Sequence, residues 1–124
     1  MRAHLISKVL IASLLGFALA PTAAMADAPD DQSALAGLKT AKVAFDLKDG
    51  DGRQMLYRLN IIDETRQSLI KQGVQPEFVL TFRGPASKLV QSDLRELSAE
   101  ERPHAVKIAA KLADMKRAPG IQSL

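Results

Sequence analysis

The 124-residue sequence predicts an α/β fold, in which helices cover both faces of a mainly parallel sheet to give three α/β/α layers. The sequence contains two successive units, each with a short apolar run followed by a helical pattern. Residues 120–124 then resemble the start of a third strand. The order β-α-β-α-β implies right-handed crossovers and parallel strands. Because the sequence stops inside the third strand, we expect an incomplete domain whose remaining strands are missing.

The first two strands are predicted from apolar runs bounded by turn residues. The first covers residues 43–47 and leads into a glycine-rich turn at 48–52. The second covers residues 78–82, is rich in aromatic and β-branched side chains, and ends at the Gly-Pro pair 84–85. Both runs are typical of buried strands.

A helical pattern follows each of these strands. Residues 53–72 carry apolar side chains three and four positions apart, which indicates an amphipathic helix. A later helix runs to Arg117, and two starting points remain open for it. Ser98 begins the S-x-x-E pattern of a capping box, whereas Pro103 lacks a backbone donor and also allows a start near Arg102.

The first 26 residues have the pattern of a secretory signal peptide. A positively charged start precedes the apolar run 9–20, and the small residues of 24–26 suit cleavage between Ala26 and Asp27. The run is much shorter than the roughly 20 apolar residues of a membrane-spanning helix. We therefore expect a periplasmic protein with no membrane segment after cleavage; an uncleaved membrane anchor is the alternative.

Cleavage would leave a nearly neutral chain. Two of the 17 basic residues and none of the 14 acidic ones fall in 1–26, so the mature chain carries a net charge of +1. Its basic residues are not clustered with aromatic ones, which argues against nucleic-acid binding. There is no cysteine, which excludes thiol catalysis in this sequence. We expect a flexible segment over 27–40 and the α/β domain over 41–124.

A ligand of such a domain would bind beyond the carboxyl ends of the strands, where helix N-termini offer free N–H groups. Arg53 and Arg83 lie in the two loops expected there and could together hold a small anion. The predicted ligand-binding residues are Asp46, Gly50, Gly52, Arg53, Arg83, Gly84 and Ser87. Their three glycines would allow a ligand to approach the backbone closely. In the alternative interpretation the glycines and Asp49 and Asp51 only form turns, Arg83 is solvated or paired locally, and the acidic side chains repel an anion.

No catalytic, metal or cofactor site is predicted. The sequence lacks complete dinucleotide, phosphate-loop, calcium-loop and serine-hydrolase motifs. His104 has no nearby partner for a metal site, and we interpret it as exposed or packed on a helix. Glu100 and Glu101 suit the start of a helix, where negative charge is favourable, and Ser98 suits a cap.

Four sequence blocks together resemble the DsrE/DsrF-like family, and the likeness covers most of residues 40–124. The blocks are 42–51, 59–62, 73–78 and 81–86. The resemblance implies a three-layer α/β/α domain, commonly oligomeric, and for cytoplasmic members a role in persulfide relay. The sulfur-carrying members use a cysteine, and in similar exported proteins one often follows the third strand.

This chain has no residue that could carry a persulfide. The expected function is therefore that of an exported binding or carrier protein without catalytic residues, linked to sulfur-compound metabolism and taking a small anionic or sulfur-containing ligand. The alternative is a non-catalytic structural or interaction subunit of a homo-oligomer or of an assembly with a related subunit.

Overall fold

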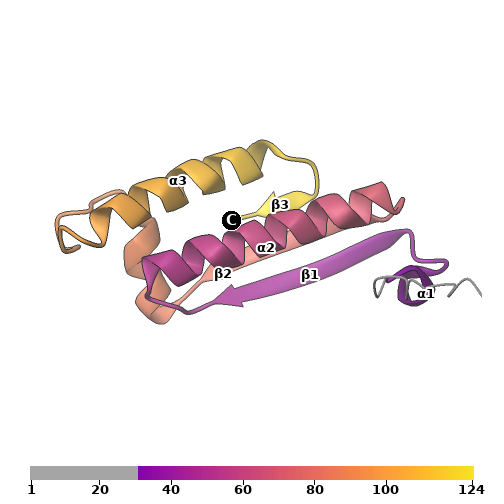
Figure 1. Ribbon diagram of the computed structural model, residues 1–124, viewed down its shortest axis with the longest axis horizontal. Coiled ribbons are helices and arrows are strands. Elements are labelled where there is room, and N and C mark those ends of the chain that lie inside the picture. Colours follow the sequence, from indigo (N-terminus) through magenta and orange to yellow (C-terminus); the bar gives the residue numbers. More distant parts are fainter. Residues whose placement is uncertain (1–30) are drawn as a thin grey trace, which may run out of the picture.

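The computed structural model describes residues 31–124 (Figure 1). The predicted signal peptide, its cleavage site and the first part of the segment 27–40 lie outside the described residues. The elements in chain order are α1 (Gln32–Leu35), β1 (Thr40–Leu47), α2 (Gly52–Lys71), β2 (Gln75–Phe82), the 3-10 helix η1 (Gly84–Val90), α3 (Arg102–Arg117) and β3 (Ile121–Ser123).

The three strands form one parallel sheet in the order β1-β2-β3, which confirms the predicted α/β class and the β-α-β-α-β order. The strands β1 and β2 pair along their full length, from Thr40 opposite Gln75 to Leu47 opposite Phe82. The short strand β3 pairs with β2 around Phe78. Both long strands begin three residues before the predicted runs, because their first residues still pair with each other.

Pro76 lies inside β2, the central strand, although proline has no N–H to donate. Successive N–H groups of β2 point to opposite neighbours: that of Gln75 reaches the Lys39 carbonyl beside β1, and that of Phe78 reaches the Gly120 carbonyl beside β3. Residue 76 therefore faces the β3 side, before β3 begins to pair. The missing donor of Pro76 breaks no strand pairing.

Both long helices lie on the same face of the sheet. They contact each other along their lengths, and Figure 1 shows them side by side. Each strand is added next to the preceding one in the same direction across the sheet. Because both crossovers are right-handed, the helices that form them, α2 and α3, lie on one side of the sheet. Residues 31–124 thus form two layers, and the second helical layer of the predicted arrangement is not among the described elements.

Alternation along the strands agrees with this one-sided cover. Phe78 and Leu80 of β2 are buried under the helices, whereas Val79 and Thr81 between them are exposed. A single core joins the helices to that face of the sheet. Its buried members are Leu47, Met55, Leu59, Ile62, Leu69, Val74, Phe78, Leu80, Ala86, Leu89, Ile108 and Met115.

The start of α3 combines the two predicted alternatives. The Ser98 hydroxyl accepts from the Glu101 N–H at 3.2 Å, and the Glu101 carboxylate accepts from the Ser98 N–H at 3.0 Å. This reciprocal pair is a capping box. It closes the turn that precedes the helix, and α3 itself begins at Arg102 with Pro103 in its first turn, where no donor is needed.

A buried polar network, which we did not predict, joins the two helices. Asp63 of α2 accepts from Arg66 Nε at 2.9 Å and from Lys111 Nζ of α3 at 2.8 Å. The Arg66 guanidinium also donates to the Pro119 carbonyl at 3.0 Å, just before β3. The network therefore fixes α3 and the approach to β3 against α2.

No helix in the described part of the chain is both long enough and apolar enough to cross a membrane.

Candidate functional site

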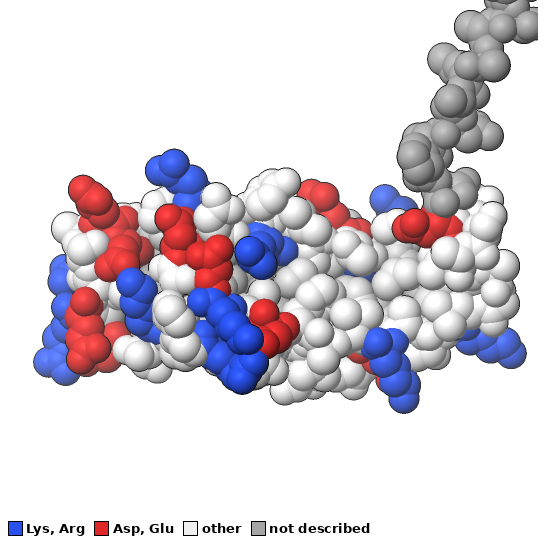
Figure 2. All heavy atoms as spheres, turned by 90° about the horizontal axis from the view of Figure 1, so that it is seen from below, with Lys and Arg blue, Asp and Glu red and all other residues white. Residues whose placement is uncertain are grey.

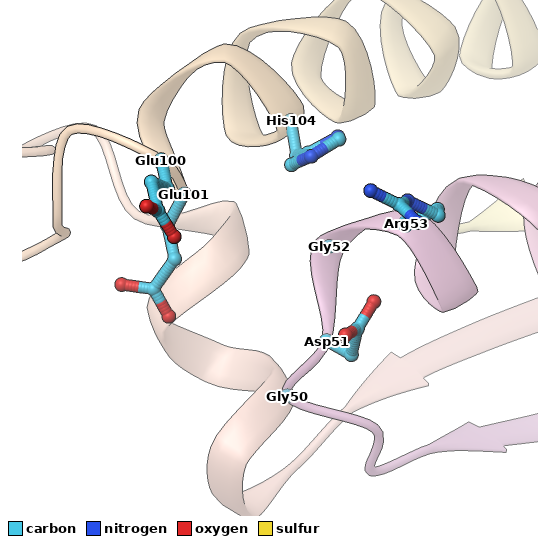
Figure 3. Close-up of a pocket in the computed structure, with 7 residues that line it drawn as sticks. All are labelled: Gly50, Asp51, Gly52, Arg53, Glu100, Glu101 and His104. Carbon is cyan, nitrogen blue, oxygen red and sulfur yellow. The ribbon is translucent and has the colours of Figure 1, made fainter.

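A hollow of about 710 Å³ lies between the first turn of α2 and the start of α3 (Figure 3). We name it the α2–α3 hollow. Its lining residues are Gly50, Asp51, Gly52, Arg53, Glu100, Glu101 and His104. Three of the predicted site residues, Gly50, Gly52 and Arg53, are among them. The volume is within the range of roughly 300–1,000 Å³ that is usual for small-molecule sites.

The turn from β1 into α2 is held by two aspartates. The Asp49 carboxylate accepts from the Asp51 N–H at 3.0 Å, and the Asp51 carboxylate accepts from the Gln54 N–H at 2.9 Å. The second bond caps the helix, and it is the main reason why the pKa of Asp51 is lowered. Both aspartates are turn formers, as the alternative interpretation held.

At Gly50 and Gly52, side chains of the protein itself leave no room for a Cβ atom. A Cβ on Gly52 would be 2.6 Å from the Cβ of His104, and a Cβ on Gly50 would be 2.7 Å from the Cβ of Pro85. Close approach of a ligand to this backbone was the predicted reason for these glycines. The structure shows packing of α3 and η1 against the turn instead.

Arg53 and His104 form one wall of the hollow, and Figure 3 shows the guanidinium of Arg53 directed toward the His104 ring. Within residues 31–124 the guanidinium makes no hydrogen bond or ion pair. The Nδ1 atom of His104 is buried and has no hydrogen-bond partner among the described residues. This wall therefore offers the hydrogen-bond donors of Arg53, which the described part of the protein does not use, whereas the buried Nδ1 atom of His104 is not exposed to a ligand in the hollow.

Glu100 and Glu101 form the opposite wall, on the turn before α3 (Figure 3). Glu101 is already engaged, because its carboxylate accepts from Lys88 Nζ at 2.6 Å and from the Ser98 N–H. The hydrogen bond from Lys88 is the main cause that lowers the pKa of Glu101 to about 2. Glu100 is exposed, and its carboxylate has no hydrogen bond or ion pair in the described part of the chain.

Arg83 and Asp46 are not among the residues that line the hollow, so the structure does not bring Arg53 and Arg83 together there. Arg83 donates hydrogen bonds from Nε and Nη2 to the carboxylate of Asp46, and Lys48 Nζ lies 3.1 Å from the same carboxylate. The hydrogen bond from Arg83, followed by that from Lys48, holds the pKa of Asp46 far below its usual range. Arg83 is thus paired locally, as the alternative interpretation held.

Gly84 and Ser87 are also outside the hollow, in η1. Gly84 has a φ of +55° and open space around it, so its backbone conformation explains the glycine. Figure 2 shows basic and acidic side chains intermixed at the left end of the molecule, where Figure 1 places the carboxyl ends of β1 and β2. The region beyond the carboxyl ends of the strands, where the ligand was predicted, therefore carries mixed charge. Of its predicted site residues, only those at the start of α2 line the hollow.

His104, Glu100 and Glu101 line the site but were set aside as structural residues. His104 does pack on a helix, over Gly52, and it also faces the hollow. About 50 positions separate it from Gly52 in the sequence, and no sequence pattern links such distant positions. The capping box did place the two glutamates at a helix start, but it did not indicate which element they would face.

The lining residues of the hollow offer three carboxylates, one guanidinium and one imidazole. No serine, threonine, tyrosine or lysine is among them, and the sequence has no cysteine. Within residues 31–124, no group of three or more histidine, aspartate or glutamate side chains could hold a metal ion. The charged side chains of the lining can recognise a ligand by charge and hydrogen bonds.

Comparison with known proteins gives one partial relative to report. An uncharacterized protein of Aquifex aeolicus (strain VF5) is 31% identical over 75 residues, which are 60% of this chain and 34% of the relative. The chain thus aligns with about a third of that protein's length. No family model matches the sequence, and no solved structure gives a significant match.

Proposed function

We propose that this chain is a non-catalytic binding or carrier protein that holds the anionic group of a small molecule in the α2–α3 hollow. The observation that carries the proposal is the guanidinium of Arg53, which lines the hollow and makes no hydrogen bond or ion pair with residues 31–124. Guanidinium groups form strong, directional hydrogen bonds with carboxylates and with oxyanions of sulfur. Arg83, the other candidate, is occupied by Asp46.

Two of the three nearby acidic groups are already in use. Asp51 caps α2, and Glu101 is bound by Lys88 and Ser98. The Lys88 ammonium offsets the charge of Glu101, and the cap bond holds the Asp51 carboxylate, which stays charged, at the start of α2.

Substitution of Arg53 should separate this proposal from a purely structural role. We expect ethanesulfonate and propionate to bind the wild-type chain, and Arg53→Gln to weaken both by about tenfold or more, because a charge-assisted hydrogen bond contributes roughly 1.5–3 kcal/mol. Isothermal titration calorimetry measures both affinities. The protein used is the one recovered after expression of the full chain. Arg83→Gln is the matched control and should leave both affinities unchanged. Equal affinities in wild type and Arg53→Gln would contradict the proposal.

We also propose that the protein is exported to the periplasm and belongs among DsrE/DsrF-like proteins linked to sulfur compounds. The signal pattern of residues 1–26 and the four sequence blocks support this. Mass spectrometry of the protein from the periplasm of an expressing bacterium should give a chain that begins at Asp27. An intact Met1 in the membrane fraction would instead support an uncleaved anchor.

An interaction subunit is the second candidate, and it is favoured by the face of the sheet that neither long helix of residues 31–124 covers, named here the uncovered face. Parallel sheets are usually covered on both faces. Here Lys42 pairs with Glu77 across the uncovered face, and the exposed Val79 lies beside Ala44. If this face is used for assembly with a second copy or a related subunit, sedimentation should show an oligomer that Val79→Lys dissociates without affecting ethanesulfonate binding.

A further inference from the structure

The α2–α3 hollow keeps opposite charges apart. Arg53 lies on the α2 side and Glu100 on the turn before α3, and both line the same space (Figure 3). No nitrogen of Arg53 lies within 4.0 Å of a carboxylate oxygen of Glu100 or Glu101. Each free charge therefore faces the hollow without neutralising the other.

Of the acidic groups at the hollow, Glu100 is the one that remains available. Asp51 accepts the Gln54 N–H, and Glu101 is held by Lys88 and by the Ser98 N–H. Glu100 has no such partner among the described residues. The hollow thus presents on one wall the cation Arg53, whose charge acts on the neighbouring Asp51 without a hydrogen bond or ion pair, and on the other wall the carboxylate of Glu100, which has no partner among the described residues.

A ligand with a single charge satisfies only one of these walls. A simple anion at Arg53 would be repelled by Glu100, and a simple cation at Glu100 would be repelled by Arg53. A small molecule with an anionic group at one end and an ammonium group at the other would be attracted by both. The lining is also rich in charged side chains, which suits a small polar molecule.

We infer that the ligand of the α2–α3 hollow is zwitterionic, of the class of amino acids and amino sulfonates, with its anionic group on Arg53 and its ammonium group on Glu100. This inference rests on the proposed function and adds the second recognition group. Glu100 is then the residue that selects such a ligand over a simple anion.

Three probes of matched size test it on the full chain by calorimetric titration: ethanesulfonate, 2-aminoethanesulfonate and ethylammonium. We expect 2-aminoethanesulfonate to bind at least tenfold more tightly than either of the other two. In Glu100→Gln its advantage over ethanesulfonate should disappear, while ethanesulfonate should bind as well as before or better. Glu96→Gln, an exposed acid outside the hollow, is the control and should change neither affinity. Circular dichroism and the melting temperature verify that each variant is folded.

The outcomes separate the two claims. If ethanesulfonate binds through Arg53 and the amino group adds nothing, the zwitterion inference is wrong and the anion-binding function stands. If the advantage of 2-aminoethanesulfonate persists in Glu100→Gln, the ammonium group is not held by Glu100, and the inference is also wrong. If none of the probes binds, the proposed function fails and the inference fails with it.

Discussion

Replacement of Asp63 by alanine should lower the free energy of unfolding by about 3 kcal/mol, because it leaves two cations without their shared counter-ion. Asp63 accepts from Arg66 and from Lys111, and the side chains of Asp63 and Arg66 are only 15% and 9% exposed. Loss of one partner of a buried ion pair costs far more than loss of an exposed pair. Urea denaturation followed by circular dichroism measures the change.

Asp114→Ala is the matched control for this prediction. Asp114 pairs with Arg117 at 2.8 Å, but these side chains are 74% and 76% exposed. We expect a loss of less than about 0.5 kcal/mol. Similar losses in the two variants would mean that the network of Asp63 does not stabilise the contact between α2 and α3.

The same carboxylate gives the stability an acid dependence. Burial by itself raises the pKa of Asp63, but the hydrogen bonds from Lys111 and Arg66 outweigh it and leave the pKa below its ordinary value of 3.8. A lowered folded-state pKa stabilises the fold above the ordinary value, and this contribution is lost as the pH falls through the folded-state pKa. The pH dependence of stability below pH 4 should therefore be shallower in Asp63→Ala than in the wild type.

Gly120→Ala should destabilise the protein by about 3 kcal/mol, through two separate costs. Gly120 has a φ of +93°, a conformation that alanine adopts only with strain. A Cβ there would also lie 2.5 Å from Cγ and 3.0 Å from the carbonyl oxygen of Pro76. The Gly120 carbonyl accepts from the Phe78 N–H at 2.7 Å, so we expect β3 to lose its pairing with β2.

Gly73→Ala isolates the conformational cost from the steric one. Gly73 has a φ of +77° and nothing within 4 Å of its Cβ position. We expect a loss of about 1 kcal/mol there. Hydrogen exchange should show loss of protection at the Phe78 amide in Gly120→Ala only. Unchanged protection of that amide in Gly120→Ala would show that the contact with Pro76 does not hold β3 in place.

The helices and strands were predictable because local spacing specifies them. The pattern over 53–72 differs by one residue at each end from α2, which spans Gly52–Lys71. The sequence also contains a pattern that indicates a sheet covered by helices on one face only. Lys42, Asp46 and Glu77 alternate with apolar residues, which is typical of a strand with one solvent-facing side. We interpreted the runs as fully buried and overlooked that alternation.

The pairing of Arg83 with Asp46 could have been predicted from strand register. The arrangement of the residues that line the hollow could not. Asp46 lies opposite Thr81, and Arg83 follows two positions later, so the two side chains share a face. The turn that carries Arg53 leads to the helix-covered face instead. The meeting of Gly52 with His104 depends on how α3 packs, and no local pattern encodes that contact.

The contact of Gly52 with His104 also sets the width of the hollow. Any side chain at position 52 would place its Cβ 2.6 Å from the Cβ of His104, so α3 could not pack this closely on the first turn of α2 without the glycine. Arg53 is the next residue of that turn, and Glu100 lies four positions before His104. The lack of a side chain at position 52 therefore lets the two elements that carry Arg53 and Glu100 lie close together, which limits the length of a molecule that can bridge them.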